Sequence, residues 1–368
     1  MKTTLLLQVS LLLSALTTVR AADGYPPFSW DHVPVSAHLA IRDGLEPEQY
    51  DFLAEHFNFI TFTGGKIHSK TVEPNIAAGA RAIKQRNPNA KVLFYWCPCQ
   101  RRGTHERNNW QLFFSNFPEN GYMPGGEQFD VTQKALRDWW TDWAAKAVSE
   151  YSCDGLFLDG LCQGQPGFLW SRKYGEEKAA QMDKAMIQMM KEAREKIGPD
   201  KLFIFNELHA PYGELYLTVT DGAMIADFDR GANVKQQPKE DMANNIEAMS
   251  RASKEGKIVI FKGWPGFTWW SDKEMLKKPH EEIHNVAKER ITFPLASFLV
   301  GAGPNCYFCY TWGWLGEYGT YDWYPEFDKP LGAPKGDAIR KGWTYHREFE
   351  HASVFLDLEN KTARIDWK

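Results

Sequence analysis

Short apolar runs that end on an acid recur three times in the middle of this sequence. In the clearest case, Cys153–Gly160, the apolar residues lead directly into Asp159 and a glycine. The runs that end on Glu207, and on Asp227 and Asp229, have the same form. Such runs are typical of parallel strands buried on both faces. Because the carboxyl ends of parallel strands meet at one edge, we expect these acids to meet where barrel enzymes carry out their chemistry.

Strand and helix signals alternate along the whole chain. Strands are expected at Val35–Ile41, Phe59–Thr63, Val92–Cys97, Gly155–Asp159, Leu202–Glu207, Ala223–Asp229, Ile258–Lys262 and Cys306–Thr311. Helices are expected at Pro47–Phe57, Pro74–Gln85, Thr132–Glu150, Glu176–Lys196, Lys239–Glu255 and His280–Leu299. This repeated alternation predicts an α/β fold, the (β/α)8 TIM barrel.

Segments outside the strand and helix pattern complete the expected organisation. Residues 1–22 contain a lysine, an apolar run and two closing alanines, which is typical of a secretory signal peptide and too short for a convincing membrane anchor. Residues 23–350 are expected to form the catalytic barrel, with a long loop at 98–130 after the third strand as a wall or lid. Residues 351–368 alternate apolar and polar side chains and predict a small hairpin-like extension. We therefore expect a secreted or periplasmic protein without a membrane segment after signal cleavage.

Charge and cysteine content restrict the possible partners. The formal net charge of −4 argues against a nucleic-acid partner, which would favour a basic stripe. Export would permit disulfides, and Cys97 or Cys99 could reach Cys162 if neighbouring strands bring them together. The six cysteines lack the compact spacing of a structural zinc site, so we expect one bridge at most and buried thiols otherwise. No cofactor or metal is expected, and the oligomeric state is open.

Asp159 and Glu207 form the first candidate for a catalytic pair. Two carboxyl groups cut a glycosidic bond when one protonates the leaving oxygen and the other attacks or activates water. Acids that end neighbouring strands are expected at a separation of roughly 5 Å, which fits a retaining mechanism. The alternative is a structural role, in which either acid caps the next helix or pairs with Lys262 or Arg230.

Asp227 and Asp229 are the competing acids. They share one face of the expected sixth strand, and either one could donate the proton in place of Glu207 or bind substrate hydroxyls. The sequence does not decide whether the proton-donating acid lies on the fifth or on the sixth strand.

Further residues near the expected strand ends are candidates for substrate binding. Flat aromatic side chains cover the apolar C–H faces of sugar rings, and many of the 15 tryptophans lie near strand ends. Lys262 ends the seventh strand, where it would pair with an acid or hold an anionic substrate group, and the ion pair is the favoured interpretation. The expected binding residues are Asp227, Asp229, His38, Trp96, Lys262, Trp264, Tyr310 and Trp312, with His209 also pointing towards the rim.

Two segments resemble glycoside hydrolases. The run from Asp154 to Asp159 resembles the DG-x-F-x-D strand of glycoside-hydrolase-like barrels, and Arg347–Leu356 is similar to a closing segment of hypothetical glycosyl hydrolase family fifteen. The resemblance implies a barrel glycosidase that acts on α-linkages or on a polysaccharide. In α-amylase-like and dextranase-like barrels the fourth strand carries the nucleophile and the fifth an acid, positions that Asp159 and Glu207 match. The α-galactosidase-like clan pairs the fourth strand with the sixth, which implies Asp227 or Asp229.

The chain also departs from both groups. Phe157 stands where amylase-like strands have arginine and galactosidase-like strands have lysine, and Lys262 stands where amylases have an acid. The substrate therefore does not follow from either group. Arg101, Arg102 and Arg230, with Lys262, would favour an acidic or sulfated polysaccharide.

Three functional hypotheses follow, led by an exported retaining glycoside hydrolase with a carbohydrate substrate. A metal-dependent barrel hydrolase needs a His-x-His pair on the first strand, but His38 stands alone between Ser36 and Ala40. A non-catalytic carbohydrate-binding barrel would have lost a catalytic acid, whereas Asp159 and Glu207 are both present.

Overall fold

The computed structural model describes residues 24–41, 44–64, 72–99, 120–124, 128–208, 213–229 and 236–368. Several expectations fall on residues outside these ranges, namely the signal peptide at 1–22, most of the loop at 98–130, Arg101, Arg102, His209 and Arg230. No helix in the described part of the chain is long and apolar enough to span a bilayer.

Eight parallel strands form one sheet in sequence order. They are β1 (Ala37–Ala40), β2 (Phe59–Thr63), β3 (Lys91–Trp96), β4 (Gly155–Leu158), β5 (Leu202–Asn206), β6 (Gly222–Ile225), β7 (Ile258–Gly263) and β8 (Cys306–Tyr310). A parallel bridge between Val35 and Phe308 joins β8 to the segment before β1 and closes the sheet. The (β/α)8 TIM barrel predicted from the sequence is confirmed, and every predicted strand overlaps an observed one.

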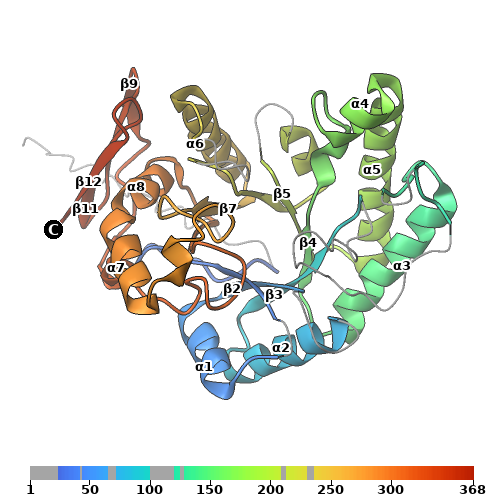
Figure 1. Ribbon diagram of the computed structural model, residues 1–368, viewed down its shortest axis with the longest axis horizontal. Coiled ribbons are helices and arrows are strands. Elements are labelled where there is room, and N and C mark those ends of the chain that lie inside the picture. Colours follow the sequence, from blue (N-terminus) through green and yellow to red (C-terminus); the bar gives the residue numbers. More distant parts are fainter. Residues whose placement is uncertain are drawn as a thin grey trace, which may run out of the picture.

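Helices surround the sheet, as Figure 1 shows. They are α1 (Pro47–His56), α2 (Glu73–Arg86), α3 (Lys134–Glu150), α4 (Leu169–Tyr174), α5 (Glu176–Ile197), α6 (Lys239–Lys254), α7 (His280–Arg290), α8 (Thr292–Gly301) and the short α9 (Pro325–Asp328). The single helix expected at His280–Leu299 is wrong, because the chain forms two helices that meet at Ile291. Pro294 has no N–H to donate to the carbonyl of Arg290, so the first helix cannot continue through it.

Strand register decides which side chains fill the barrel. Tyr95, Phe157 and Ile204 pair in succession across β3, β4 and β5, so they point to the same face of the sheet. The ring of His38 on β1 lies 4.6 Å from the ring of Phe157 and 6.4 Å from that of Tyr95. Side chains from three strands can meet in this way only inside the barrel. By the two-residue period of a strand, Asp159 follows Phe157 on the inner face at the carboxyl end.

The motif around the fourth strand, Asp154–Gly160, contains residues that fix the packing of the strand and one acid at the rim of the barrel. A Cβ atom at Gly155 would lie 2.0 Å from the carbonyl oxygen of Leu202, so only glycine allows β4 and β5 to pack this closely. Gly160 has φ of +77°, which glycine adopts without strain. Asp154 accepts a hydrogen bond from the backbone N–H of Val92, and its carboxylate pairs with Lys84 at 2.8 Å. Asp159 is thus the acid of the motif that lies at the carboxyl end of the strand.

The C-terminal extension is a four-stranded antiparallel sheet of β9 (Ile339–Lys341), β10 (Thr344–Glu348), β11 (Ala352–Asp357) and β12 (Thr362–Trp367). It lies against α8 at the edge of the barrel (Figure 1). The buried guanidinium of Arg347 donates to the carbonyls of Leu299 and Ala302 at the end of α8. These bonds satisfy carbonyls that a helix end leaves without partners and fix the sheet to the barrel.

Candidate active site

Asp159 lies at the carboxyl end of β4 and accepts hydrogen bonds from two neighbouring strands. The hydroxyl of Tyr95 on β3 donates to Oδ2 at 2.5 Å, and the amide of Asn206 on β5 donates to Oδ1 at 3.1 Å. The side chain is largely buried, with 9% of the residue exposed. Both partners are neutral donors, and donors directed at a carboxylate stabilise its charged form. Asp159 is therefore held as an oriented carboxylate at the barrel mouth.

Glu207 directly follows β5 in an uncommon backbone conformation. Its φ is +75°, one of four positive values among the described non-glycine residues. Its backbone N–H donates to the side-chain oxygen of Asn206 at 2.9 Å, and the next residue, Leu208, bonds to the carbonyl of Met224 on β6. A left-handed backbone at a non-glycine residue costs free energy and is enriched at functional sites.

Asn206 links the two acids. Its side-chain oxygen accepts from the N–H of Glu207, which leaves its NH2 group to donate to Asp159. Register explains this arrangement, because Phe157 pairs with Ile204, and two residues further along each strand Asp159 stands level with Asn206. Sequence reasoning placed Glu207 on the face of Phe203 and Phe205. Those rings instead contact Arg194 of α5 and Tyr216, outside the barrel.

The Glu207 carboxylate lies near the connection that follows Asp159. Burial, and then the negative charge of Glu207, raise the pKa of the Cys162 thiol well above its ordinary value. The same thiol lies 3.7 Å from the backbone oxygen of Glu207. Cys162 belongs to the short 3-10 helix Leu161–Gly164, which begins two residues after Asp159. Both candidate acids therefore lie on the β4–β5 side of the mouth.

His38 is buried inside the barrel below the mouth. Burial, only partly offset by the charge of Asp159, lowers its pKa to about 3, so the imidazole is neutral near pH 7. Its ring packs 4.7 Å from that of Trp314 and edge-on to Phe157. His38 thus contributes to the packing beneath Asp159.

Lys262 is also enclosed, with none of its surface exposed. Its ammonium donates to the hydroxyl of Thr311 at 2.6 Å and to the carbonyl of Thr311 at 2.5 Å. It lies 4.2 Å from the ring centre of Trp264 and 5.4 Å from that of Trp314. Among the described residues Lys262 forms no ion pair: its close contacts are neutral oxygens and aromatic faces, and the negative charge of Asp229 acts on it without a direct contact. Burial lowers its pKa to about 8.

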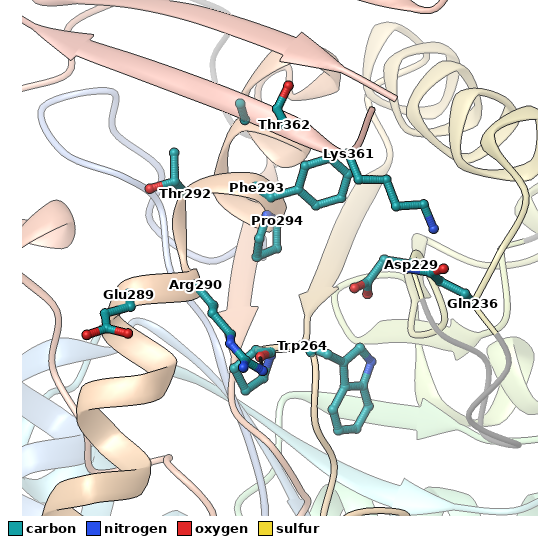
Figure 2. Close-up of a pocket in the computed structure, with 13 residues that line it drawn as sticks. Asp229, Gln236, Trp264, Glu289, Arg290, Thr292, Phe293, Pro294, Lys361 and Thr362 are labelled. Carbon is teal, nitrogen blue, oxygen red and sulfur yellow. Dashed lines mark hydrogen bonds between the residues drawn. The ribbon is translucent and has the colours of Figure 1, made fainter. Parts of the chain in front are cut away.

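A pocket of about 380 Å³ opens on the β6–β7 side of the rim (Figure 2). Its lining combines residues from the ends of β6 and β7, from the junction of α7 and α8, and from the turn between β11 and β12. In Figure 2 the carboxylate of Asp229 and the indole of Trp264 face the same space, with Lys361 beside Asp229. The Trp264 ring is fixed by a 2.8 Å hydrogen bond from Nε1 to the carbonyl of Ala226. Asp227 is half-buried and is not among the residues that line this pocket.

Three aromatic residues expected at the mouth lie elsewhere. Trp96 faces outwards, where its ring packs 6.2 Å from Trp139 and 6.4 Å from Trp140 of α3. Tyr310 also faces outwards, and its hydroxyl donates to the carbonyl of Ala287 on α7 at 2.8 Å. Trp312 is 1% exposed, next to the rings of Phe267 and His280. All three pack against helices and loops, and none of them lines the pocket on the β6–β7 side.

A family model described as hypothetical glycosyl hydrolase family 15 matches residues 84–353, well over half of the chain. The chain belongs to this glycosyl hydrolase family. The match includes both candidate acids, the pocket residues that follow β6 and β7, and the start of the C-terminal sheet.

Solved structures with distant similarity are also glycoside hydrolases. The glycoside hydrolase domain of PelA from Pseudomonas aeruginosa has 15% sequence identity and a TM-score of 0.47, over 80% of this chain and 96% of that one. A noncanonic maltogenic alpha-amylase, AmyB from Thermotoga neapolitana, has 11% identity and a TM-score of 0.49, over 89% of this chain and 86% of that one. These likenesses are distant, and the barrel is assigned here from the strand order and register of the chain itself.

Two residues beside the candidate catalytic pair were not predicted from the sequence. Tyr95 and Asn206 both contact Asp159, and each stands at or near the end of a predicted strand. The two-residue period would have placed Tyr95 inside, but only the pairing of β3, β4 and β5 shows that these side chains reach the same carboxylate.

The cysteines of this glycosyl hydrolase family member are buried free thiols. This holds for Cys97, Cys99 and Cys162, between which a bridge was considered, and for Cys153, Cys306 and Cys309. The sulfurs of Cys97 and Cys99 lie 3.5 Å apart. In the described part of the chain, no three His, Cys, Asp or Glu side chains are grouped in a way that could hold a metal ion.

Proposed function

We propose that this family member cleaves O-glycosidic bonds of an oligo- or polysaccharide by a retaining mechanism, with Asp159 as nucleophile and Glu207 as general acid and base. The observation that carries the proposal is the Asn206 bridge. One side chain holds the Asp159 carboxylate and the Glu207 backbone at the carboxyl ends of adjacent strands. A retaining mechanism needs a carboxyl separation of roughly 5 Å, and this separation is part of the proposal.

Asp159 fits the nucleophile because its environment favours a fixed, charged carboxylate. Tyr95 and Asn206 each donate to a different oxygen, which orients the carboxyl plane towards the mouth. Such preorganised donors need no rearrangement during the reaction. The side chain is largely buried, so little water competes for it.

Glu207 fits the acid and base because it directly follows β5 beside Asp159, and the Asn206 side chain ties its backbone to that carboxylate. It would protonate the glycosidic oxygen while Asp159 attacks the anomeric carbon, so that one C–O bond forms as the other breaks. The resulting Glu207 carboxylate would then take a proton from a water molecule as the water oxygen attacks the anomeric carbon. The bond between the sugar and Asp159 breaks, and the sugar leaves with its original configuration. The left-handed backbone at Glu207 is consistent with a position constrained by function.

A glycan panel with product analysis by NMR tests this proposal. Wild type, Asp159→Asn and Glu207→Gln are compared on α- and β-linked glucans, galactans and amino-sugar polymers, and the anomer first released is followed. Loss of activity in both variants and retention of configuration are expected. Inversion would contradict the nucleophile role, and full activity of Glu207→Gln together with loss in Asp227→Asn or Asp229→Asn would move the acid to the sixth strand. Glycan binding without any cleavage would identify a binding barrel instead.

We further propose that residues 1–22 direct export. A lysine, an apolar run and two alanines in this order support a cleavable signal. Expression of the full chain in a secreting host, followed by N-terminal sequencing of the protein in the medium, is expected to show a start near residue 23. Retention of the full-length chain inside the cells would contradict this.

A further inference from the structure

The pocket in Figure 2 is built jointly by the barrel and the C-terminal sheet. The turn between β11 and β12 contributes Lys361 and Thr362, and the barrel contributes Asp229 and Trp264. We propose that this pocket binds a mono- or disaccharide unit of the substrate next to the scissile bond. The C-terminal sheet then forms part of the substrate-binding site. This inference rests on the proposed glycosidase function and assigns one of its sugar-binding subsites.

The size and position of the pocket fit this role. Its volume of about 380 Å³ falls within the range of roughly 300–1,000 Å³ for small-molecule sites. Asp229 follows β6, and β6 neighbours β5, which Glu207 directly follows. The next residue, Leu208, bonds to Met224 of β6. A glycan with its scissile bond at Asp159 and Glu207 can therefore continue around the rim into this pocket.

Trp264 provides a rigid apolar surface for a sugar ring. Its indole N–H is bonded to the Ala226 carbonyl, and the ammonium of Lys262 lies over its ring. Only 7% of the residue is exposed, so the ring is fixed in place and presents a limited part of its surface. Phe293 and Pro294 line the wall above it (Figure 2). Flat aromatic and apolar surfaces of this kind cover the C–H faces of sugars.

The polar groups of the pocket favour a neutral, hydroxyl-rich ligand. Among the lining residues that the structure describes, Asp229 and Glu289 supply two carboxylates and Arg290 and Lys361 supply two cations, so the formal charges of these residues balance. Gln236 adds an amide with both donor and acceptor groups. Sugar hydroxyls donate and accept at once and match such a mixed set, whereas a polyanionic glycan would meet as much repulsion as attraction.

The C-terminal sheet holds Lys361 in a fixed position. The sheet is anchored to α8 through the buried Arg347, which donates to the carbonyls of Leu299 and Ala302. Lys361 has φ of +51° in the tight turn, and its ammonium lies 3.5 Å from the carbonyl of Gln237 beside the pocket. The side chain thus reaches from the sheet to the barrel side of the pocket.

Binding of defined hexasaccharides tests the inference separately from catalysis. Maltohexaose, cellohexaose, xylohexaose and chitohexaose are titrated into the full chain by calorimetry, and turnover is measured in parallel. Lys361→Met keeps the apolar stem and removes the charge, and Gln236→Ala alters an exposed residue on the other side. Lys341→Met, an exposed lysine of the same sheet outside the pocket, is the matched control.

We expect each pocket variant to weaken binding of the preferred hexasaccharide roughly fivefold, the effect of one hydrogen bond, with Lys341→Met unchanged. Unchanged affinity in both pocket variants, or no binding of any hexasaccharide to wild type, would overturn the inference. Binding that depends on Lys361 without turnover would support the subsite and contradict the proposed function. Turnover with both the affinity and the KM unchanged in the two pocket variants would support the function and overturn the subsite.

Discussion

The two ends of β4 carry two acids with opposite surroundings. At the amino end, Asp154 pairs with the ammonium of Lys84 and accepts the backbone N–H of Val92. At the carboxyl end, Asp159 accepts hydrogen bonds from the neutral side chains of Tyr95 and Asn206. Both carboxylates are largely buried, so burial alone does not distinguish their roles.

The difference shows how a barrel separates stability from chemistry. A salt bridge and a hydrogen bond from the backbone hold Asp154 in place at the amino end of the strands. Neutral donors from the adjacent strands instead orient Asp159 at the end where barrel enzymes bind substrate. The predictions below test this division, from the largest expected effect to the smallest.

Glu207→Gln is expected to show the largest effect, a loss of roughly 10³-fold in kcat on natural glycosides, because the glutamine cannot donate the proton. Aryl glycosides with good leaving groups need little protonation, so their first step should be much less affected. Rates on a leaving-group series measure this directly. Equal loss on every leaving group would mean that Glu207 has a structural role like that of Asp154.

Asp229→Asn provides the control for that assignment. Asp229 lines the pocket that we propose binds sugar, so its variant should raise KM and change kcat much less than Glu207→Gln. A selective loss of kcat in Asp229→Asn would place the acid on the sixth strand.

Lys262→Met tests the buried cation beside the mouth through the pH dependence of stability. Burial lowers the pKa of Lys262 from 10.5 to about 8. Between these two values the unfolded chain still holds the proton that the folded chain has released. The wild-type free energy of unfolding should therefore rise relative to the variant from pH 8 to pH 10.5, by up to about 3 kcal/mol.

Chemical denaturation of both proteins across this pH range measures the difference, and groups common to both cancel. A constant difference in the free energy of unfolding would mean that Lys262 keeps its ordinary pKa.

Asp154→Asn should lower stability by about 2 kcal/mol without changing kcat, because it removes a charged hydrogen bond at the amino end of the barrel. Denaturant melts and initial rates on the same preparation test this. Lys84→Met should produce a similar loss, since it breaks the same ion pair. Reduced kcat in fully folded Asp154→Asn would break the proposed division between the two ends.

Tyr95→Phe should have the smallest effect, a decrease of roughly tenfold in kcat/KM, because Asp159 loses the neutral donor that bonds to its Oδ2. With one donor gone, the charged carboxylate is less favoured, so the acidic limb of the pH–rate profile should also move to higher pH. A change in melting temperature with an unaltered pH profile would assign Tyr95 to packing alone.

The sequence predicted the barrel well because most of its strands are short apolar runs separated by helical segments, and three of these runs end on acids. It also placed Asp159 correctly at the carboxyl end of β4. It could not supply the pairing register, which brings Asn206, and not Glu207, level with Asp159. The turn of the backbone at Glu207 depends on the Asn206 side chain and on β6, so strand periodicity gave no sign of it.

Aromatic residues near strand ends were the least predictable. Trp96 and Tyr310 point outwards to the helices, although each lies at the end of a strand, because a shift of one residue reverses the face. Lys262 was expected to need an acid, yet Thr311 and two tryptophan faces satisfy its ammonium. The partners of a buried cation come from distant segments, and a single sequence does not reveal them.

The most direct measurement compares Asp159→Asn with Asp154→Asn on one glycan substrate, with kcat and melting temperature determined on the same preparations. We predict that Asp159→Asn loses roughly 10³-fold in kcat and changes its melting temperature little, whereas Asp154→Asn melts several degrees earlier with wild-type kcat. Full activity of Asp159→Asn, or equal loss of activity in both folded variants, would contradict the assignment of Asp159 as the catalytic carboxylate of the fourth strand.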